Sequence, residues 1–141
     1  MPDTARRPKP VIIGVAGGSG SGKTTVVREI VGALGPGHVT VVQHDSYYRD
    51  RSGMSPAERS AVNYDHPDAL ETSLLVGHVR ALLGGEPVKV PVYDFATHTR
   101  TADTVEALPR CSVIVEGILV LADTELRELM DIRVSVDTDA D

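Results

Sequence analysis

Hydrophobic and polar positions along this chain alternate between strand-like runs and helix-like faces. Four short apolar runs rich in β-branched residues predict strands, at residues 11–16, 39–42, 113–115 and 132–136. Two longer segments place apolar residues at helical spacing; they run from 24 to 34 and from Pro67 to the glycine pair at 84–85. Shorter helices are expected over 55–62 and after Asp123, a capping residue. Strands that alternate with helices predict an α/β fold with a mostly parallel sheet and flanking helices.

Two further segments, 88–95 and 99–105, have a different pattern. In the first segment, apolar residues alternate with two intervening polar or proline residues, and the second segment is rich in threonine. We therefore expect a small antiparallel β-ribbon that projects from the main sheet. Pro91 cannot donate to a ladder and favours an edge position. In open parallel sheets ligands bind beyond the carboxyl ends of the strands. This rule points to residues 17–24, 43–48, 116–118 and the region after 136.

The segment between the first strand and the first helix matches the phosphate-binding pattern G-x-x-x-x-G-K-[ST]. Its residues are Gly17, Gly18, Ser19, Gly20, Ser21, Gly22, Lys23 and Thr24. Glycines let backbone N–H groups surround an anion, and the helix N-terminus adds positive dipole. Lys23 can reach the β- and γ-phosphates and the Thr24 hydroxyl can ligate Mg²⁺. A merely flexible glycine-rich turn is disfavoured, because strand, loop, Lys-Thr and helix occur in the required order.

Two carboxylates follow predicted strands. Glu116 ends an apolar strand, where an acid in a phosphate-loop protein holds Mg²⁺, although a surface carboxylate just past a strand is the alternative. Asp45 follows the second strand and could accept the proton of an attacking hydroxyl. Taken alone, an aspartate in a polar loop is more often simply solvated.

The few aromatic residues fall in segments expected near one end of the sheet. They are Tyr47, Tyr48, Tyr64, Tyr93 and Phe95. Rings gathered there could sandwich a flat ligand such as a base, with ordinary core packing as the alternative for each ring. His98, at the turn of the ribbon, could hydrogen-bond a ligand edge, but its spacing alone favours simple exposure.

Composition narrows the functional classes. The net charge of −6 gives no reason to expect nucleic-acid binding. Cys111 is the only cysteine, so no intrachain disulfide can form, and a reducing cytoplasm fits. No apolar run approaches the ~20 residues of a membrane span. Residues 1–10 are polar with three prolines and are expected to be a disordered leader.

Several blocks beyond the phosphate loop occur together. They are Gly17–Thr25 with its final Thr25, His44–Asp50, Asn63–Ala69, Pro91–Phe95, His98-Thr99-Arg100 and Val115–Leu119. The phosphate loop is shared by very many proteins, whereas this combination is specific. From Val11 to Thr138 the chain resembles the uridine kinase (uridine–cytidine kinase) family of phosphate-loop kinases.

The resemblance implies a role for each matched residue. Asp45 would be the general base for a nucleoside 5′-hydroxyl, and Lys23 would act with it on the phosphates of ATP or GTP held by residues 17–25. Thr24 and Glu116 would hold Mg²⁺. Asp65 would bind the ribose 2′- and 3′-hydroxyls, and Tyr93 and His98 the pyrimidine edge. The residues around the nucleoside would be Tyr48, Tyr64, Phe95 and Ile118.

The family further implies a cytoplasmic homotetramer that phosphorylates uridine or cytidine to UMP or CMP in pyrimidine salvage, with no nucleic-acid or membrane partner. In the family an arginine-rich lid, further helices and a last strand follow the strand at 132–136, and these 141 residues hold none of them. We therefore expect residues 11–141 to be an incomplete phosphate-loop kinase domain. The alternatives are a nucleotide-binding pseudokinase or subunit, and a sister kinase such as phosphoribulokinase or pantothenate kinase. The Tyr64-Asp65 and Tyr93…His98 pairs argue against a sister kinase.

Overall fold

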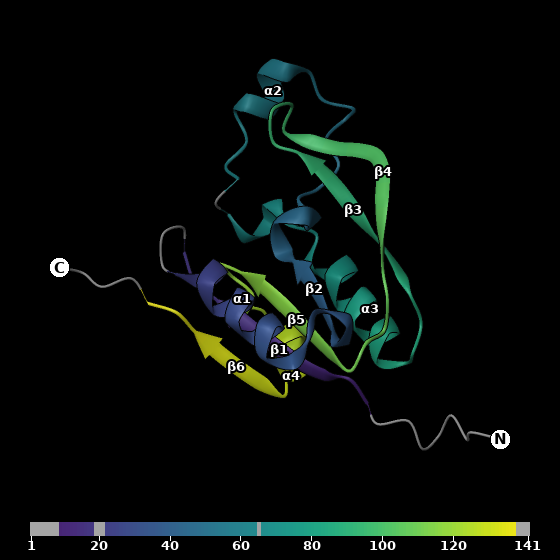
Figure 1. The fold of residues 1–141 in the computed structure, drawn as a ribbon. Helices are drawn as coiled ribbons and strands as arrows, with labels where there is room; N and C mark the ends of the chain where they lie inside the picture. The colour runs from purple at the N-terminus through teal and green to yellow at the C-terminus, as the bar shows by residue number, and fades with distance from the viewer. Residues whose placement is uncertain (1–8, 19–21, 65, 138–141) are drawn as a thin grey trace.

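A parallel sheet forms the centre of the molecule (Figure 1). The computed structural model describes residues 9–18, 22–64 and 66–137. Within them, four strands lie in the order β2-β5-β1-β6, and every pairing is parallel. The strands are β1 (Val11–Ala16), β2 (Val39–Gln43), β5 (Ser112–Gly117) and β6 (Ile132–Ser135). The expected α/β fold with a mostly parallel sheet is confirmed.

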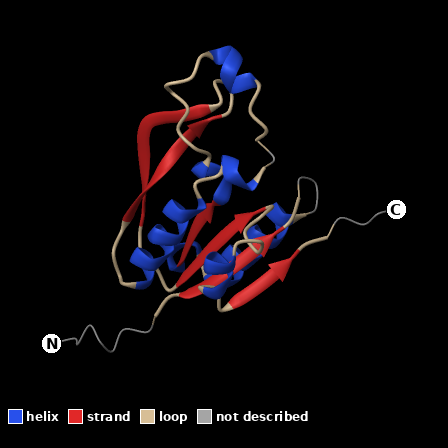
Figure 2. Ribbon diagram, turned by 180° about the vertical axis from the view of Figure 1, so that it is seen from behind, coloured by secondary structure: helices blue, strands red, loops and turns tan. Residues whose placement is uncertain are grey.

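Apolar β-branched side chains explain why these segments form the sheet, since strands covered on both faces read as continuous apolar runs. Helix α1 (Lys23–Leu34) covers one face, where its buried Val27 joins a cluster with Ile13, Val15 and Ile114. Helix α3 (Thr72–Leu83) packs with the residues of the opposite face, including Ile12, Val113 and Val115. Figure 2 shows helices on both sides of the strands.

The expected antiparallel ribbon is present and forms a sheet of its own. It consists of β3 (Val88–Asp94) and β4 (Thr99–Ala107), with a register shift between Pro91 and Tyr93. The ribbon rises from the parallel sheet, and its tip approaches helix α2 (Pro56–Ser60) (Figures 1 and 2). Because no strand pairing joins the two sheets among the residues that the structure describes, side-chain contacts have to set the orientation of the ribbon.

Short helices connect the larger elements and have clear capping signals. Ser55 and Glu58 form a reciprocal capping box at the start of α2. Asp123 caps α4 (Thr124–Glu128), where its Oδ1 accepts from the Leu126 N–H at 2.8 Å. Three 3₁₀ turns complete the described chain: η2 (Pro36–His38), η3 (His44–Tyr47) and η4 (Pro67–Ala69). No helix in the described ranges is long and apolar enough to cross a membrane.

One predicted helix is broken near its start. The long helix expected from Pro67 is instead the 3₁₀ turn η4 followed, after two residues, by α3. Leu70 is extended, with φ −103° and ψ 136°, and forms an isolated antiparallel bridge with Tyr48. The helical spacing of leucines could not reveal this pairing with a distant segment. The helix expected over 24–34 begins one residue earlier, at Lys23.

Candidate active site

The described parts of the phosphate loop have the features of an anion site. Gly17 and Gly18 continue from β1, and Gly22 acts as N-cap of α1 with a left-handed φ of 91°. The first turn of α1 contains no acidic residue and its N-cap makes no side-chain hydrogen bond, so its N–H groups face no competing carboxylate there. Lys23 is half-buried at the first helical position. Ser19, Gly20 and Ser21 lie outside the described residues.

Glu116 lies at the carboxyl end of β5, as the strand pattern predicts. Parallel pairing places it beside Val15 of β1 and Gln43 of β2. Its side chain is buried, and Oε1 accepts a hydrogen bond from Gln43 Nε2 at 3.2 Å. The alternative of a solvated surface carboxylate is therefore wrong for this residue. Gln43 begins the segment 43–48 to which the strand-end rule points, but no pattern marked it as a partner of Glu116.

The residues near the loop suit a magnesium ion by their chemistry. Thr24 and Thr25 are exposed in the first turn of α1, and Glu116 is a buried carboxylate at the same edge of the sheet. Hydroxyl and carboxylate oxygens are the hard ligands that Mg²⁺ prefers. Among the described residues no group of three or more His, Cys, Asp or Glu forms a metal cage. A two-ligand set fits a metal that keeps waters and takes substrate phosphates as its remaining ligands.

Asp45 lies on the 3₁₀ turn η3 that continues from β2, and its side chain is half-buried. It lines a cavity of about 270 Å³ together with Tyr48, Tyr64 and Ile118. The remaining lining residues are His44, Leu70 and Leu119. Four residues that the resemblance assigned to the acceptor site therefore meet at one cavity. Asp65 lies outside the described residues.

The aromatic residues gather as expected, although they come from separate segments. The Tyr48 ring lies 5.1 Å from that of Tyr93, 5.9 Å from that of Tyr64 and 6.3 Å from that of Phe95, between centroids. Most of these pairs are edge-to-face, the arrangement favoured by aromatic quadrupoles. Phe95 remains 60% exposed and Ile118 56% exposed. The cluster therefore presents apolar surface beside the Asp45 cavity.

Tyr93 carries a polar atom that the described residues do not satisfy. Its side chain is buried, and its hydroxyl has no hydrogen-bond partner within ordinary limits. Burial, with smaller effects from the neighbouring Tyr64 and Tyr48, raises the pKa of Tyr93 to about 12. The phenol therefore stays protonated at neutral pH, and it can donate to a ligand. A buried donor without a partner indicates a place for a ligand acceptor.

His98 is more constrained than its spacing suggested. It is half-buried at the ribbon tip, with a left-handed φ of 55°, and stacks on Tyr64 at 5.0 Å between centroids. The Tyr64 hydroxyl donates to the Arg59 carbonyl at 2.7 Å and to the His98 carbonyl at 3.5 Å. The expectation of a simply exposed histidine is wrong, because tertiary stacking holds it.

Tyr47 does not belong to the aromatic site. It is wholly buried in the core against α3, and its hydroxyl hydrogen-bonds His78 Nδ1 at 2.6 Å. Burial raises its pKa above the ordinary tyrosine value. The 3₁₀ turn directs adjacent tyrosines to different surroundings, so Tyr47 packs in the core while Tyr48 lines the Asp45 cavity.

His44 is a site residue that the sequence reasoning missed. It is 2% exposed and lines the same cavity as Asp45. Its Nε2 hydrogen-bonds the Thr72 hydroxyl at 2.9 Å, while its buried Nδ1 has no partner in the described chain. Burial lowers its pKa, against weaker opposite effects of Asp45 and Asp123. Its position directly before Asp45 was the available signal, but adjacency does not reveal burial.

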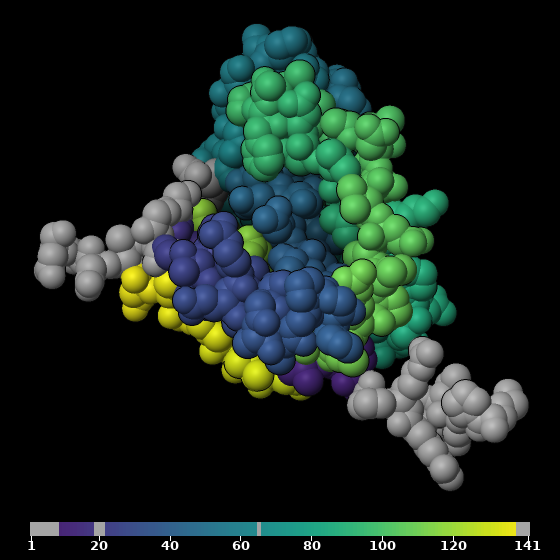
Figure 3. Space-filling view, in the orientation of Figure 1, coloured from purple at the N-terminus to yellow at the C-terminus, as the bar shows by residue number. Residues whose placement is uncertain are grey.

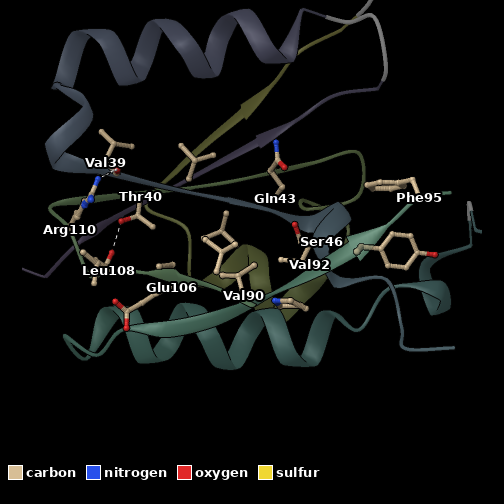
Figure 4. A pocket seen from close by; sticks show the side chains of 16 residues that line it. Val39, Thr40, Gln43, Ser46, Val90, Val92, Phe95, Glu106, Leu108 and Arg110 are labelled. Atoms are coloured by element: carbon tan, nitrogen blue, oxygen red, sulfur yellow. Dashed lines mark hydrogen bonds between the residues drawn. The ribbon is translucent and has the colours of Figure 1, made fainter. Parts of the chain in front are cut away.

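A larger groove of about 670 Å³ lies between β2 and the ribbon (Figure 4). Figure 3 shows the hollow between the green ribbon and the blue part of the chain. The groove shares Tyr93 and Phe95 with the aromatic cluster, but Asp45 and the described phosphate-loop residues do not line it. Choosing the cavity with the larger volume would therefore place the candidate active site away from Asp45 and the phosphate loop.

Comparison with known proteins agrees with this geometry. A protein named uridine kinase from Streptococcus pyogenes serotype M5 is 51% identical over 133 residues, covering 94% of this chain and 64% of its own. A uridine kinase from Brevibacillus brevis is 49% identical over 132 residues, covering 94% and 62%. The chain thus spans less than two thirds of the length of the curated relatives it matches.

Solved structures show the same fold. A possible uridine kinase from Bacillus stearothermophilus aligns with a TM-score of 0.67 at 20% identity, over 92% of this chain and 72% of the other. Phosphoribulokinase from Rhodobacter spheroides aligns with a TM-score of 0.68 at 18% identity, over 90% and 50%. The model of the phosphoribulokinase/uridine kinase family matches residues 12–141, and the chain belongs to that family.

Proposed function

We propose that this protein is a nucleoside kinase that transfers the γ-phosphate of ATP or GTP to the 5′-hydroxyl of uridine or cytidine. The product would be UMP or CMP, formed in pyrimidine salvage. One observation carries the proposal: aromatic rings from three separate segments gather around Tyr48, and two of them, Tyr48 and Tyr64, line the cavity that holds Asp45, at the carboxyl end of the sheet where the phosphate loop begins. Relatives at about 50% identity that bear the name uridine kinase support it.

The donor side would be formed by residues 17–25. Backbone N–H groups at the start of α1 would hold phosphate oxygens, and Lys23 would neutralise charge on the β- and γ-phosphates. Thr24 and Glu116 would hold Mg²⁺, which when bound neutralises phosphate charge during transfer. The hydrogen bond from Gln43 fixes one Glu116 oxygen and leaves the other for this role.

Asp45 would accept the proton of the 5′-hydroxyl as that oxygen attacks phosphorus. Its half-buried position at a confined cavity supports this, because a small nucleoside there would displace water from the carboxylate. The carboxylate orients the hydroxyl and takes the proton, and correct placement supplies much of the rate.

The nucleoside would lie between the cavity and the ribbon. The buried Tyr93 hydroxyl, which has no ordinary hydrogen-bond partner among the described residues, would donate to a base acceptor, and His98 would bind the same edge. Tyr48, Tyr64, Phe95 and Ile118 would pack on the faces of the base and sugar. Asp65 would accept hydrogen bonds from the ribose 2′- and 3′-hydroxyls.

A substrate panel tests the proposal. The product of the intact gene is assayed with ATP and GTP as donors and with uridine, cytidine and 2′-deoxyuridine as acceptors, with Lys23→Ala as the inactive control. We expect UMP and CMP, with 2′-deoxyuridine weaker by roughly 5- to 150-fold because the ribose-binding carboxylate loses a partner. Nucleotide binding without any nucleoside product would favour a nucleotide-binding subunit. Phosphorylation of a sugar phosphate or pantothenate would favour a sister kinase.

The proposal also places the protein in the cytoplasm, as a homo-oligomer with no nucleic-acid partner. Its acidic balance and single exposed cysteine support this. Sedimentation of the gene product measures the assembly.

A further inference from the structure

Arg100 joins the ribbon to the segment that carries the aromatic site. It follows the ribbon tip on β4 and lies opposite Tyr93. Its side chain is only 15% exposed. Nε donates to the Tyr48 carbonyl at 2.8 Å and Nη2 donates to the Tyr47 carbonyl at 3.3 Å, while Nη2 also forms an ion pair with Glu71 Oε1 at 2.8 Å. One guanidinium therefore contacts the ribbon's two neighbouring segments at once.

The two carbonyl acceptors belong to Tyr47, the last residue of the turn that carries Asp45, and to Tyr48, which follows it. The Tyr47 carbonyl also accepts from the Glu71 N–H at 2.7 Å, and Tyr48 forms its isolated bridge with Leu70. Arg100 binds this short pairing of residues 47–48 with residues 70–71 from the side of the ribbon. A planar group with several fixed donors can hold two carbonyls and a carboxylate together, which an ammonium group cannot do with the same geometry.

Thr99 forms a second link between the ribbon tip and the 47–51 segment. Its hydroxyl accepts from the Arg51 N–H at 2.8 Å and donates to Asp50 Oδ1 at 3.2 Å. Strand pairing does not join the ribbon to the parallel sheet, so these contacts orient its tip. The same contacts therefore orient the ribbon, which carries Tyr93 and His98, relative to the turn, which carries Asp45.

We propose that Arg100 is a positioning residue that holds the nucleoside-binding ribbon and the Asp45 turn in one arrangement. This inference rests on the proposed nucleoside kinase function. Loss of the guanidinium loosens the ribbon on the 47–51 segment, because among the described contacts only those of Thr99 and the rings then remain, so the base-binding groups and the proton acceptor are less well aligned on one substrate. Nucleotide binding is unaffected, because the phosphate loop continues from another strand.

The test compares Arg100→Gln and Arg100→Lys with Arg110→Gln in the product of the intact gene. Arg110 is a matched control, since its Nη1 also donates to two carbonyls, those of Pro36 at 3.0 Å and Val39 at 3.2 Å, but at the base of the ribbon. For Arg100→Gln we expect a higher uridine KM and a lower kcat, together lowering kcat/KM by about 100-fold. Arg100→Lys retains only the charge and should lose about tenfold.

The KM for MgATP should stay within about twofold in both Arg100 variants, and Arg110→Gln should change stability alone. A purely structural loss would lower kcat in proportion to the folded fraction, measured by ADP binding, and leave the uridine KM unchanged. That result, or equal kinetics for the Arg100 and Arg110 variants, would overturn the inference. If Arg100→Gln fails to fold, Arg100→Lys decides the same question.

Amide hydrogen exchange tests, without substrate, whether Arg100 couples the ribbon tip to the 47–51 segment. We expect Arg100→Gln to speed exchange at both the 47–51 segment and the ribbon tip, and Arg110→Gln to leave both unchanged. Unchanged exchange in Arg100→Gln would overturn the inference whatever the enzyme phosphorylates. A wild-type protein that leaves uridine unmodified would contradict the proposed function instead.

Discussion

A methyl group added at Gly117 should displace the turn that carries Asp45. Gly117 is the buried last residue of β5. A Cβ there would lie 2.6 Å from the Cβ of His44 and 3.1 Å from Val120 Cγ1. Ordinary contact begins at 3.4 Å, so Gly117→Ala requires His44 to retreat by about 0.8 Å. A Cβ is fixed to its backbone, so no rotamer change relieves the overlap, and η3 has to move with Asp45.

The size of the effect follows from this displacement. Overpacking of a core position costs about 1–3 kcal/mol of unfolding free energy. A misplacement of about 1 Å in a catalytic group costs roughly 100-fold in rate. We therefore expect Gly117→Ala to lower kcat for uridine by about 10- to 100-fold, with a MgATP KM within about twofold of wild type.

Gly14→Ala is the matched control. Gly14 is also buried in the sheet, on the neighbouring strand β1, and its new Cβ would overlap the side chain of Met130. That side chain is flexible and belongs to the segment before β6 and not to the turn η3, so the variant should lose stability and keep its kcat. Steady-state kinetics and thermal melting of both variants provide the comparison. Wild-type turnover in Gly117→Ala, or an equal loss of kcat in Gly14→Ala, would refute the reasoning.

Two further predictions concern stability. Tyr47→Phe leaves His78 Nδ1 without its 2.6 Å partner, and we expect a loss of about 0.5–1.5 kcal/mol in urea unfolding; unchanged stability would contradict the role of this hydrogen bond. Burial lowers the pKa of His44, and burial followed by the charge of Arg100 lowers that of His78, both from an ordinary 6.5. The unfolded chain then binds these protons more tightly than the folded protein does. The free energy of unfolding should therefore be highest above pH 6.5 and decrease as the pH falls below it. Urea titrations at several pH values measure it, and stability that rises as the pH falls below 6.5 would contradict it.

The sequence predicted the parallel sheet because its strands are continuous β-branched runs between clear turn and helix signals. It also predicted where two carboxylates lie, since Glu116 ends β5 and Asp45 follows β2, and the carboxyl ends of these strands share one edge. These inferences need only local pattern and a general rule of α/β sheets.

Other features depend on contacts between distant segments. Tyr47 and Tyr48 are neighbours in the chain, yet only the turn η3 decides which one enters the core. The break at Leu70 arises from its bridge to Tyr48. The contacts of Arg100 join segments about fifty residues apart, so no periodicity in the sequence could reveal them.

The most direct test of the central claim is single-turnover phosphate transfer from γ-labelled ATP to uridine, with the wild-type gene product and its Asp45→Asn variant. The account predicts labelled UMP from the wild type. It predicts transfer slower by about 10²–10⁴-fold in the variant, with MgATP and uridine still bound, because a general base acts in the transition state. Transfer at the wild-type rate by Asp45→Asn, or weakened uridine binding with unchanged transfer, would contradict the assignment of Asp45 as the proton acceptor.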